Sequence, residues 1–191
     1  MSRDIEILHA AAELFFDRGY ASVGVDDIGG QIGTTGPSIY RYFRGKAEIL
    51  AALFDQAIDG VLSATGSRGL APADELEHRV RAHAGFVVDH HKLASVWIRE
   101  GRHLSDADRR RLRRRENAYI AQWVACIGAA IPGLDEPIAE TAALTAIGTL
   151  NCVSNWPAVA TERAGVADYL ADFVLRGLTL HCGTTHGDRS H

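Results

Sequence analysis

Apolar residues recur every three or four positions along most of the chain, a spacing that is typical of amphipathic α-helices. Near the beginning, Ile5, Leu8, Ala12 and Phe15 follow this spacing, and Gly19 ends the run. The sequence contains no sustained alternation of apolar and polar residues that would predict β-strands. The pattern predicts an all-α fold of about nine helices, over about residues 3–18, 25–32, 36–42, 46–64, 74–91, 92–100, 105–131, 136–155 and 164–181.

One segment, from Gly33 to Lys46, carries the signals of a tight turn followed by a short helix. Gly33 can adopt the left-handed backbone that ends one helix, and Thr34 or Thr35 can cap the next helix with a hydroxyl oxygen. Pro37 then falls in the first turn, where its missing N–H costs nothing. Helix, short helix, tight turn and short helix is the order of a helix-turn-helix motif, whose second helix enters the major groove of DNA.

The outward face of the short helix has side chains that suit DNA. Ile39 and Phe43 are four residues apart and point inward, which leaves Ser38, Arg41 and Tyr42 on the opposite side. Segment 33–46 contains no acidic residue. Its hydroxyl groups and cations suit phosphates and base edges, and Gly36 and Pro37 would let the helix approach closely. The alternative is an ordinary solvated basic surface, so the residues alone leave both interpretations open.

The residues of this region, taken together, resemble a known family. The strings ILHAAAELFFDRGY at 7–20, VDDI at 25–28 and GTTGPSIYRYFRGK at 33–46 are similar in order and spacing to the DNA-binding domain of the TetR family of bacterial transcriptional regulators. The resemblance implies a ligand-responsive regulator with an N-terminal helix-turn-helix domain, and it implies a phosphate contact for Lys46. The expected contacts with double-stranded operator DNA are Thr35, Gly36, Pro37, Ser38, Tyr40, Arg41, Tyr42 and Lys46.

The sequence departs from the family pattern in the helix that supports the turn. Gly29 stands where the family usually has alanine, Gly30 follows it, and Gly24 replaces the usual serine or threonine at the helix start. Each glycine inside a helix costs about 0.5–1 kcal/mol relative to alanine. We therefore expect a softer supporting helix, and an all-α small-molecule-binding protein without sequence-specific DNA binding remains the alternative function.

Composition breaks and charge suggest the domain organisation. A stretch rich in glycine, serine and proline at 65–72 breaks the chain, and we expect a DNA-binding domain at 1–46, a ligand-binding and dimerisation domain at 47–182 and a disordered tail at 183–191. The whole chain has a net charge of −4. Residues 1–46 carry five cations and six acids, which gives −1, so DNA affinity must come from the local patch.

Several features favour a reduced, cytoplasmic protein. The beginning of the sequence lacks the apolar core of a signal peptide, and no apolar run reaches the length of a membrane span. Cys126, Cys152 and Cys182 are odd in number and are interpreted as reduced, mostly buried small residues. Nucleophile elbows, phosphate-binding loops and dinucleotide fingerprints do not occur in the sequence, so we expect no enzyme and no cofactor.

Two further clusters have competing interpretations. Six arginines at 109–115 predict either a second phosphate patch or, more often, a solvated helix face neutralised by Asp106, Asp108 and Glu116. His83, His90 and His91 beside Trp97 do not match the spacing of a known metal site, so we expect no metal.

Aromatic residues on different helices of the second half predict either a ligand pocket or plain core packing. The candidate ligand-binding residues are Phe86, Trp97, Tyr119, Trp123 and Asn151. Resemblance to the family favours the pocket. Such a pocket would suit a small apolar or amphipathic effector, of fatty acyl or acyl-CoA type. The acidic end of this effector could pair with an arginine of the run at 109–115.

The expected function is that of a repressor released from a palindromic operator by the effector. Two copies would place their recognition helices in successive major grooves. The last two long helices carry more apolar residues than one core-facing stripe requires, and they are expected to hold the homodimer through Ile138, Leu144, Leu170 and Phe173.

Overall fold

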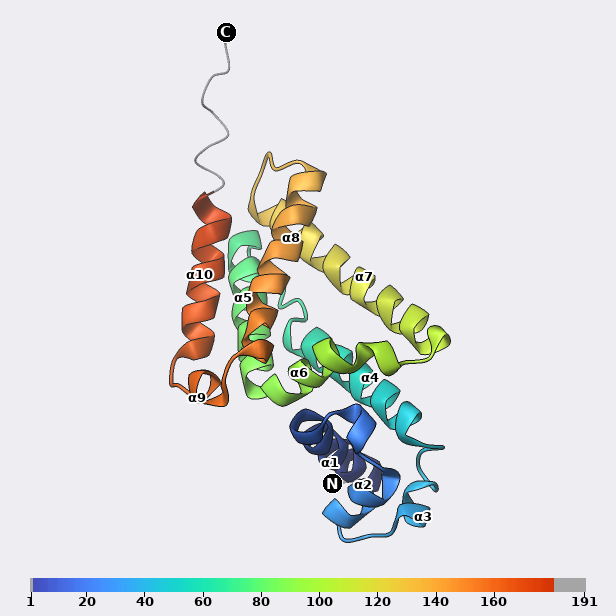
Figure 1. The fold of residues 1–191 in the computed structure, drawn as a ribbon. Helices are drawn as coiled ribbons and strands as arrows, with labels where there is room; N and C mark the ends of the chain where they lie inside the picture. The colour runs from blue at the N-terminus through green and yellow to red at the C-terminus, as the bar shows by residue number, and fades with distance from the viewer. Residues whose placement is uncertain (1, 181–191) are drawn as a thin grey trace. The chain divides into compact units, whose positions relative to one another are not determined.

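The computed structural model describes residues 2–180, and these fold into ten α-helices and three short 3-10 helices (Figure 1). The all-α prediction is confirmed. The helices are α1 (Arg3–Arg18), α2 (Val25–Gln31), α3 (Gly36–Ile39), α4 (Lys46–Ala64), α5 (Pro72–Asp89), α6 (His91–Glu100), α7 (Asp106–Ala130), α8 (Glu136–Asn151), α9 (Ala158–Thr161) and α10 (Val166–Leu180); the 3-10 helices are η1 (Tyr20–Ser22), η2 (Gly101–His103) and η3 (Cys152–Asn155). Cys182 and the tail expected at 183–191 lie outside the described residues.

Local signals account for most helix ends. Ser105 caps α7, since its Oγ accepts the backbone N–H of Asp108 at 3.1 Å. Asp135 caps α8 by accepting the backbone N–H of Ile138 at 3.0 Å. The helix expected to end at residue 155 tightens into η3 after Asn151, and the one-turn helix α9 was not expected because its four residues are too short for a periodic pattern.

The described chain divides into two compact units. Unit 1 consists of residues 1–60 and 90–116, and unit 2 consists of residues 61–89 and 117–191. The divisions after residues 60 and 116 fall inside α4 and α7, so both helices contribute to each unit. None of the described helices is both long and apolar enough to cross a bilayer.

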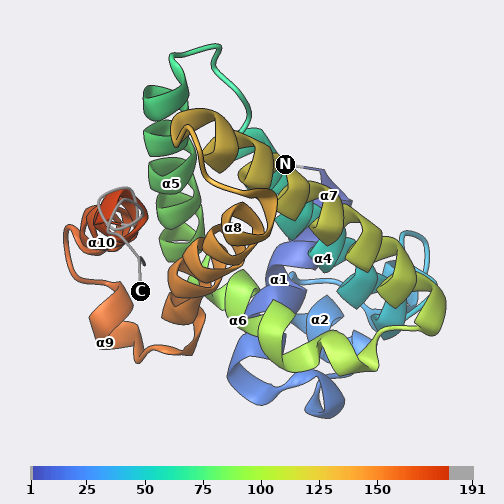
Figure 2. The same ribbon diagram turned by 90° about the horizontal axis from the view of Figure 1, so that it is seen from above.

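Unit 1 is built around α1. Figure 2 shows α1 and α6 next to each other. Leu8 and Phe15 of the predicted stripe of α1 are buried, but Ile5 is 37% exposed and Ala12 is half-buried. The buried face also includes Ile7, Ala11 and Leu14, so the predicted stripe was centred too far to one side. The core is completed by buried side chains of α2, α3 and the first part of α4, among them Ile28, Ile39, Ile49 and Phe54.

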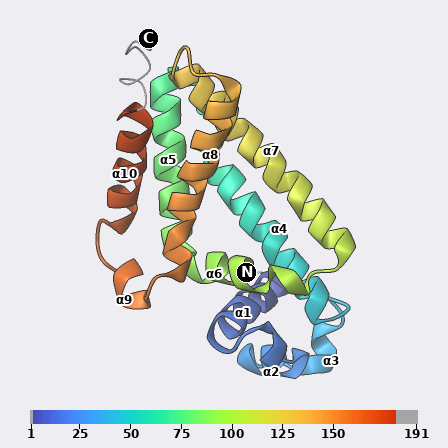
Figure 3. The ribbon, with the colours of Figure 1, turned by 45° about the horizontal axis from the view of Figure 1, so that its top comes forward.

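Unit 2 is a bundle in which α5 lies beside α8 and α10 (Figure 3). Its core also receives the second part of α7, and Trp123 of that helix is completely buried. The remaining core positions are mostly small or aliphatic side chains such as Val80, Ile127, Ala143 and Leu150. The four helices therefore enclose one continuous apolar interior.

Candidate nucleic-acid interface and ligand-binding residues

The turn before α3 follows from two sequence features. Gly33 has a φ of 65°, the left-handed conformation that its lack of a side chain allows, and Pro37 lies in the first turn of α3. The expected threonine cap is wrong in its chemistry. Thr35 is the N-cap residue, but its hydroxyl lies 3.0 Å from the Ser38 hydroxyl instead of accepting a backbone N–H. The two hydroxyl groups thus form a polar pair at the N-terminus of α3.

The face of α3 has the expected orientation. Ile39 is fully buried and Phe43 is 9% exposed, whereas Tyr40 and Tyr42 are 58% and 47% exposed. The helix ends at Ile39, earlier than expected, and the chain continues in turns to Phe43. Of the other predicted contact residues, Thr35, Pro37 and Arg41 are exposed, Ser38 and Lys46 are half-buried and Gly36 is buried. The exposed surface is therefore aromatic, hydroxyl-bearing and cationic.

Close packing between α2 and the turn explains the unusual glycines. A Cβ atom at Gly29 would lie 2.9 Å from the carbonyl carbon of Thr35 and 3.0 Å from the nitrogen of Gly36. Backbone atoms cannot move aside as a flexible side chain can, so Gly29 permits the approach of the two elements. At Gly30, by contrast, a Cβ would meet no atom within 4 Å. Only the first of the two glycines has a packing role.

Lys46, at the start of α4, is anchored within unit 1. Its Nζ donates to the carbonyl oxygen of Tyr20 at 2.7 Å and lies 4.2 Å from the centre of the Tyr20 ring. The Tyr20 ring in turn stacks on His103 of η2, with centroids 4.7 Å apart. The ammonium group has three N–H donors, so it can keep these contacts and still present a donor to a phosphate.

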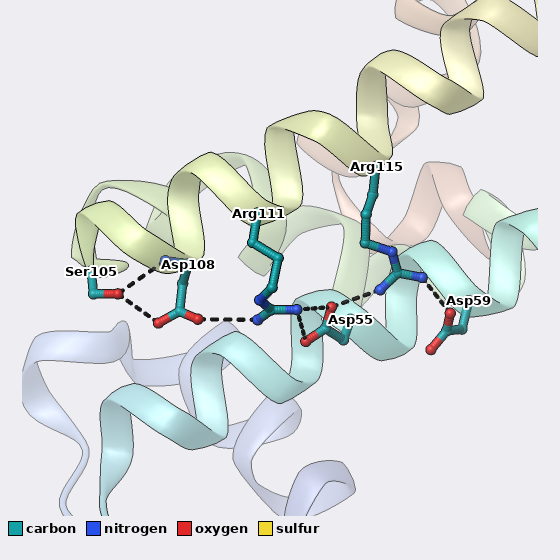
Figure 4. A network of polar contacts seen from close by, with 6 residues as sticks. All are labelled: Asp55, Asp59, Ser105, Asp108, Arg111 and Arg115. Atoms are coloured by element: carbon teal, nitrogen blue, oxygen red, sulfur yellow. Dashed lines mark hydrogen bonds and ion pairs between the residues drawn. The ribbon is translucent and has the colours of Figure 1, made fainter.

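The arginine run at 109–115 forms ion pairs with α4 in unit 1 (Figure 4). Arg111 donates to both carboxylate oxygens of Asp55, at 2.5 and 2.6 Å, and Arg115 donates to Asp55 at 2.6 Å and also to Asp59. Asp108 also accepts from Arg111, at 3.1 Å. The bond from Ser105 and this arginine hold the pKa of Asp108 below its ordinary value.

The acids that neutralise this run were only partly foreseen. Asp106 and Asp108 pair with arginines as expected. The main partners, however, are Asp55 and Asp59, which lie on successive turns of another helix, α4. Glu116 is half-buried, and burial raises the pKa of its carboxyl group although Arg113 partly offsets the shift. Sequence spacing could not reveal the α4 partners because they are more than fifty residues away.

The candidate ligand-binding residues of unit 2 form a buried polar chain. Tyr119 and Asn151 flank His83, with the Tyr119 hydroxyl 2.8 Å from Nδ1 and the Asn151 Oδ1 3.1 Å from Nε2. Burial lowers the pKa of His83 to about 4, although the bond to Asn151 raises it. His83 is therefore neutral near pH 7. Since Oδ1 can only accept, Nε2 carries the proton and Nδ1 accepts the Tyr119 O–H.

Aromatic rings surround this chain. The Trp123 ring lies 5.7 Å from His83 and 6.4 Å from Tyr119, both in edge-on arrangements, and Phe86 is partly buried against the same core. From the sequence, His83 is weighed only as a possible metal ligand. Across residues 2–180, the His, Cys, Asp and Glu side chains form no group of three that could hold a metal ion.

Trp97, the fifth candidate, belongs to unit 1. Its ring lies 4.7 Å from that of Phe54, and both line a cavity of about 340 Å³. Arg109 and Arg113 of the arginine run line the same cavity, and the pairing of an arginine with the acidic end of an effector stays a prediction. Tyr119, Trp123 and Asn151 thus lie together around His83 in unit 2. Trp97 packs on Phe54 in unit 1 and has none of these residues as a neighbour in that unit.

An apolar groove lies between α8 and α10 in unit 2. It has a volume of about 240 Å³, and its lining includes Ile138, Thr145, Phe173 and Gly177. Phe173 and Leu144 are exposed, by 60% and 49%. Leu170 was wrongly counted with them. It faces the core of unit 2 and is 4% exposed, because the apolar stripe of α10 is wide enough to supply both faces.

The sequence belongs with known regulatory proteins over most of its length. Residues 7–53 match the family model described as "Bacterial regulatory proteins, tetR family". Residues 69–178 match a second model, "Tetracyclin repressor-like, C-terminal domain". Together the two matches include segment 33–46 and the core of unit 2.

Curated relatives are similar over a shorter stretch. The transcriptional activator FasR of Mycolicibacterium smegmatis is 32% identical over 77 residues, which cover 40% of this chain and 35% of that protein. The regulator EthR of Mycobacterium tuberculosis is 33% identical over 72 residues, with 38% of this chain and 33% of that protein covered. The chain thus matches about a third of the length of these relatives.

Solved structures show the same fold along the chain. A tetR-family regulatory protein from Rhodococcus RHA1 superposes with a TM-score of 0.80 at 22% identity, covering 93% of this chain and 98% of that one. AibR, solved with isovaleryl coenzyme A and operator DNA, gives a TM-score of 0.76 at 20% identity, with 91% and 96% covered. With both family models matched in order, the chain belongs to the TetR family of bacterial transcriptional regulators.

Proposed function

We propose that the protein is a repressor that binds a palindromic operator as a homodimer and leaves it when a small apolar or amphipathic effector binds. It would act in the cytoplasm, with residues 1–46 as the DNA-binding domain and 47–182 as the ligand-binding and dimerisation domain. The observation that carries this proposal is the exposed, acid-free surface of segment 33–46 above a buried Ile39 and Phe43.

On DNA, the proposed contacts divide by chemistry. Thr35, Ser38, Tyr40 and Tyr42 would offer hydroxyl groups to base edges and phosphates, and the exposed Pro37 would add only a compact ring between α3 and the groove. Gly36 is buried and would act indirectly, since a Cβ there would clash with Oδ1 of Asp26 and push α3 away from α2. Arg41 and Lys46 would neutralise phosphates. The anchoring of Lys46 on the Tyr20 carbonyl would fix the position of its ammonium group before DNA arrives.

Dimerisation is proposed through α8 and α10. The exposed Phe173 and Leu144 and the adjacent apolar groove favour an interface there, because apolar patches on single chains usually mark contact sites. A two-fold axis would present two α3 helices about one helical turn of DNA apart.

The effector is proposed to bind in unit 2, among Phe86, Tyr119, Trp123 and Asn151. Support comes from the buried polar chain around His83 and from AibR, whose structure holds an acyl coenzyme A. An effector can shift the protein away from the operator only through a difference in affinity between the two states.

The test is a gel shift with DNA from the promoter region upstream of the protein's own coding sequence, repeated at several salt concentrations. Arg41→Gln and Lys46→Gln should each lower the slope of log K against log salt by about one, since each removes one phosphate contact. Arg114→Gln is the matched control, because this arginine is exposed on α7 outside segment 33–46, and its slope should be unchanged.

Two results would contradict the proposal. If the wild-type protein shifts its promoter no better than random DNA, the alternative function of a small-molecule-binding protein is favoured. If the bound protein raises transcription from this promoter, it is an activator, as FasR is named. If it lowers transcription only when the effector is present, the effector strengthens operator binding instead of releasing it. A transcription assay in vitro with and without the protein separates these cases.

A further inference from the structure

We propose that the effector carries a single carboxylate and that this group pairs with Arg79 in the interior of unit 2. The inference rests on the proposed effector binding and adds the chemical class of the ligand and the residue that recognises it. Neither Arg79 nor a carboxylate at this position was expected from the sequence.

Arg79 is a buried cation that forms no ion pair with any acid of the described residues. It lies on α5 and is 5% exposed, and within residues 2–180 its Nε and Nη1 are shielded from solvent and have no hydrogen-bond acceptor. A guanidinium group stays protonated in proteins, so it cannot escape this penalty by losing its charge. A buried charge is normally paired, and one that is not points to a missing anion.

Other arginines of the chain show what Arg79 lacks. Arg81, two residues further along α5, donates to Glu77 at 2.8 Å and to Asp172 at 2.9 Å. Glu75, one turn before Arg79, accepts the backbone N–H groups of Arg68 and Leu70 at 3.0 and 3.1 Å. Glu77 and Glu75, the acids of α5 nearest to Arg79 in sequence, are therefore both engaged by other groups.

The surroundings of Arg79 are those of the candidate ligand-binding residues. Arg79 lies four residues before His83 on α5, so the two buried side chains share one face of that helix. Burial raises the pKa of Cys126, and a hydrogen bond from Arg79 and its positive charge partly offset the shift. Burial also raises the pKa of Tyr119, which bonds from Trp123 and Thr65 and the charge of Arg79 partly offset. The indole N–H of Trp123 is also buried, beside Tyr119, and makes no well-aligned hydrogen bond. Nε and Nη1 of Arg79 and this indole N–H can therefore still donate, and a carboxylate has only acceptors to offer.

The charges of the site favour one carboxylate over a phosphate. His83 is neutral, and Tyr119 and Asn151 carry no charge near pH 7, so Arg79 contributes a single positive charge. A phosphate monoester has a charge of about −1.5 to −2 at pH 7 and would leave negative charge buried and unpaired. The aromatic rings of Phe86 and Trp123 would then contact an apolar chain attached to the carboxylate.

The test is calorimetric titration of the full-length protein with saturated monocarboxylates from acetate to dodecanoate, with octan-1-ol as the uncharged match of octanoate. Wild-type protein should bind octanoate about ten-fold or more tightly than octan-1-ol, the effect expected of a hydrogen-bonded buried charge pair. Arg79→Met should bind the two about equally, whereas Arg81→Met should keep the preference, because Arg81 is exposed and already paired.

A second measurement separates recognition from a purely structural role. Without ligand, Arg79→Met should melt at a higher temperature than wild type, since it removes an unpaired buried charge while keeping the apolar stem. Arg79→Lys retains the charge and should retain a carboxylate preference. If Arg79→Met fails to fold, the lysine variant and the wild-type comparison still decide the question.

Several outcomes would overturn the inference. These are wild-type protein that binds no member of the series, equal affinity for octanoate and octan-1-ol, an unchanged preference in Arg79→Met, or tighter binding of inorganic phosphate or octanoyl coenzyme A than of octanoate. The operator gel shift is independent of all of them. A wild-type protein that prefers octanoate but binds no operator would refute the proposed function and leave the role of Arg79 standing.

Discussion

At position 29 the absence of a methyl group sets how closely α2 approaches the turn before α3. Alanine is the better helix former, so propensity alone predicts that Gly29→Ala and Gly30→Ala both stabilise α2 by about 0.5–1 kcal/mol. The contacts predict opposite signs. Gly29→Ala would force a Cβ against the backbone of Thr35 and Gly36 and should destabilise the protein by about 1–3 kcal/mol, whereas Gly30→Ala should stabilise it.

Urea denaturation of the two variants measures this difference directly. The pair is matched in chemistry and adjacent in sequence, so each serves as the control for the other. Equal stabilisation of both variants would show that α2 can move away from the turn at little cost. From the sequence alone both glycines look destabilising, because a propensity scale contains no information about which face of a helix has a close neighbour.

His83 gives the protein a specific dependence on pH. Its pKa is about 4 in the folded state against 6.5 as the ordinary value, so between these pH values the unfolded chain binds a proton that the folded chain does not. Folding stability is therefore complete above about pH 6.5 and falls as the pH is lowered towards 4, by up to about 3 kcal/mol from this group.

Thermal or urea unfolding between pH 4 and 7.5 tests this prediction. His83→Gln lacks the titrating group, and its stability should fall less than that of wild type over the same window. His78→Gln is a suitable control, since this histidine lies on the same helix and is not fully buried. Parallel curves for wild type and His83→Gln would contradict the linkage.

Residue roles could be predicted where they depend on neighbours in sequence. Helical spacing within one turn predicts that Ile39 and Phe43 point inward and that Tyr40 and Tyr42 point outward. Arg79 could not be recognised, because a single arginine in an amphipathic helix has the composition of a solvated residue. Whether such a side chain is buried, and whether an acid meets it, depends on helices far away in sequence.

At the scale of elements, the ion pairs between α4 and α7 fix the first turns of α7 to α4 within unit 1. Asp55 is 28% exposed and accepts from both Arg111 and Arg115, while Asp59 is 69% exposed and pairs only with Arg115. We expect Asp55→Asn to lower stability by about 1 kcal/mol and Asp59→Asn to have little effect, since exposed pairs contribute little.

Urea denaturation at low and high salt shows whether Asp55→Asn loses stability through the broken ion pairs or through lost packing. Screening weakens ion pairs, so the difference between Asp55→Asn and wild type should shrink at about 1 M salt. A difference that does not depend on salt would assign the effect to lost packing and not to charge. The long helices themselves were predictable from periodicity, whereas their ionic partners were not.

At the scale of the molecule, the exposed surfaces of α8 and α10 predict the assembly. Phe173→Glu places a charge on the proposed interface and should convert the proposed dimer into a monomer in sedimentation equilibrium. The same substitution at Ile98, an exposed residue of α6 in unit 1, should leave the proposed dimer intact. A Phe173→Glu variant that stays dimeric would exclude this part of α10 from the interface.

The family and the fold could both be predicted from the sequence, because the turn and the short helix after it are encoded within fourteen residues, from Gly33 to Lys46. The candidate ligand site could be predicted only as a set of aromatic residues and one asparagine. Its arrangement around His83 depends on α5, α7 and α8 meeting, and Trp97 was grouped with it because the sequence carries no sign of which aromatic residues share a core.

The positions of the tryptophans give the protein three optically distinct reporters. Trp123 is sealed in the apolar interior of unit 2, Trp97 lies half-buried against Phe54 in unit 1, and Trp156 is partly open to solvent after η3. Emission from an indole shifts to longer wavelength as its surroundings become more polar. Variants that keep one tryptophan and replace the other two by phenylalanine would therefore follow the two units separately, in a single cuvette, as temperature, ligand or DNA is changed.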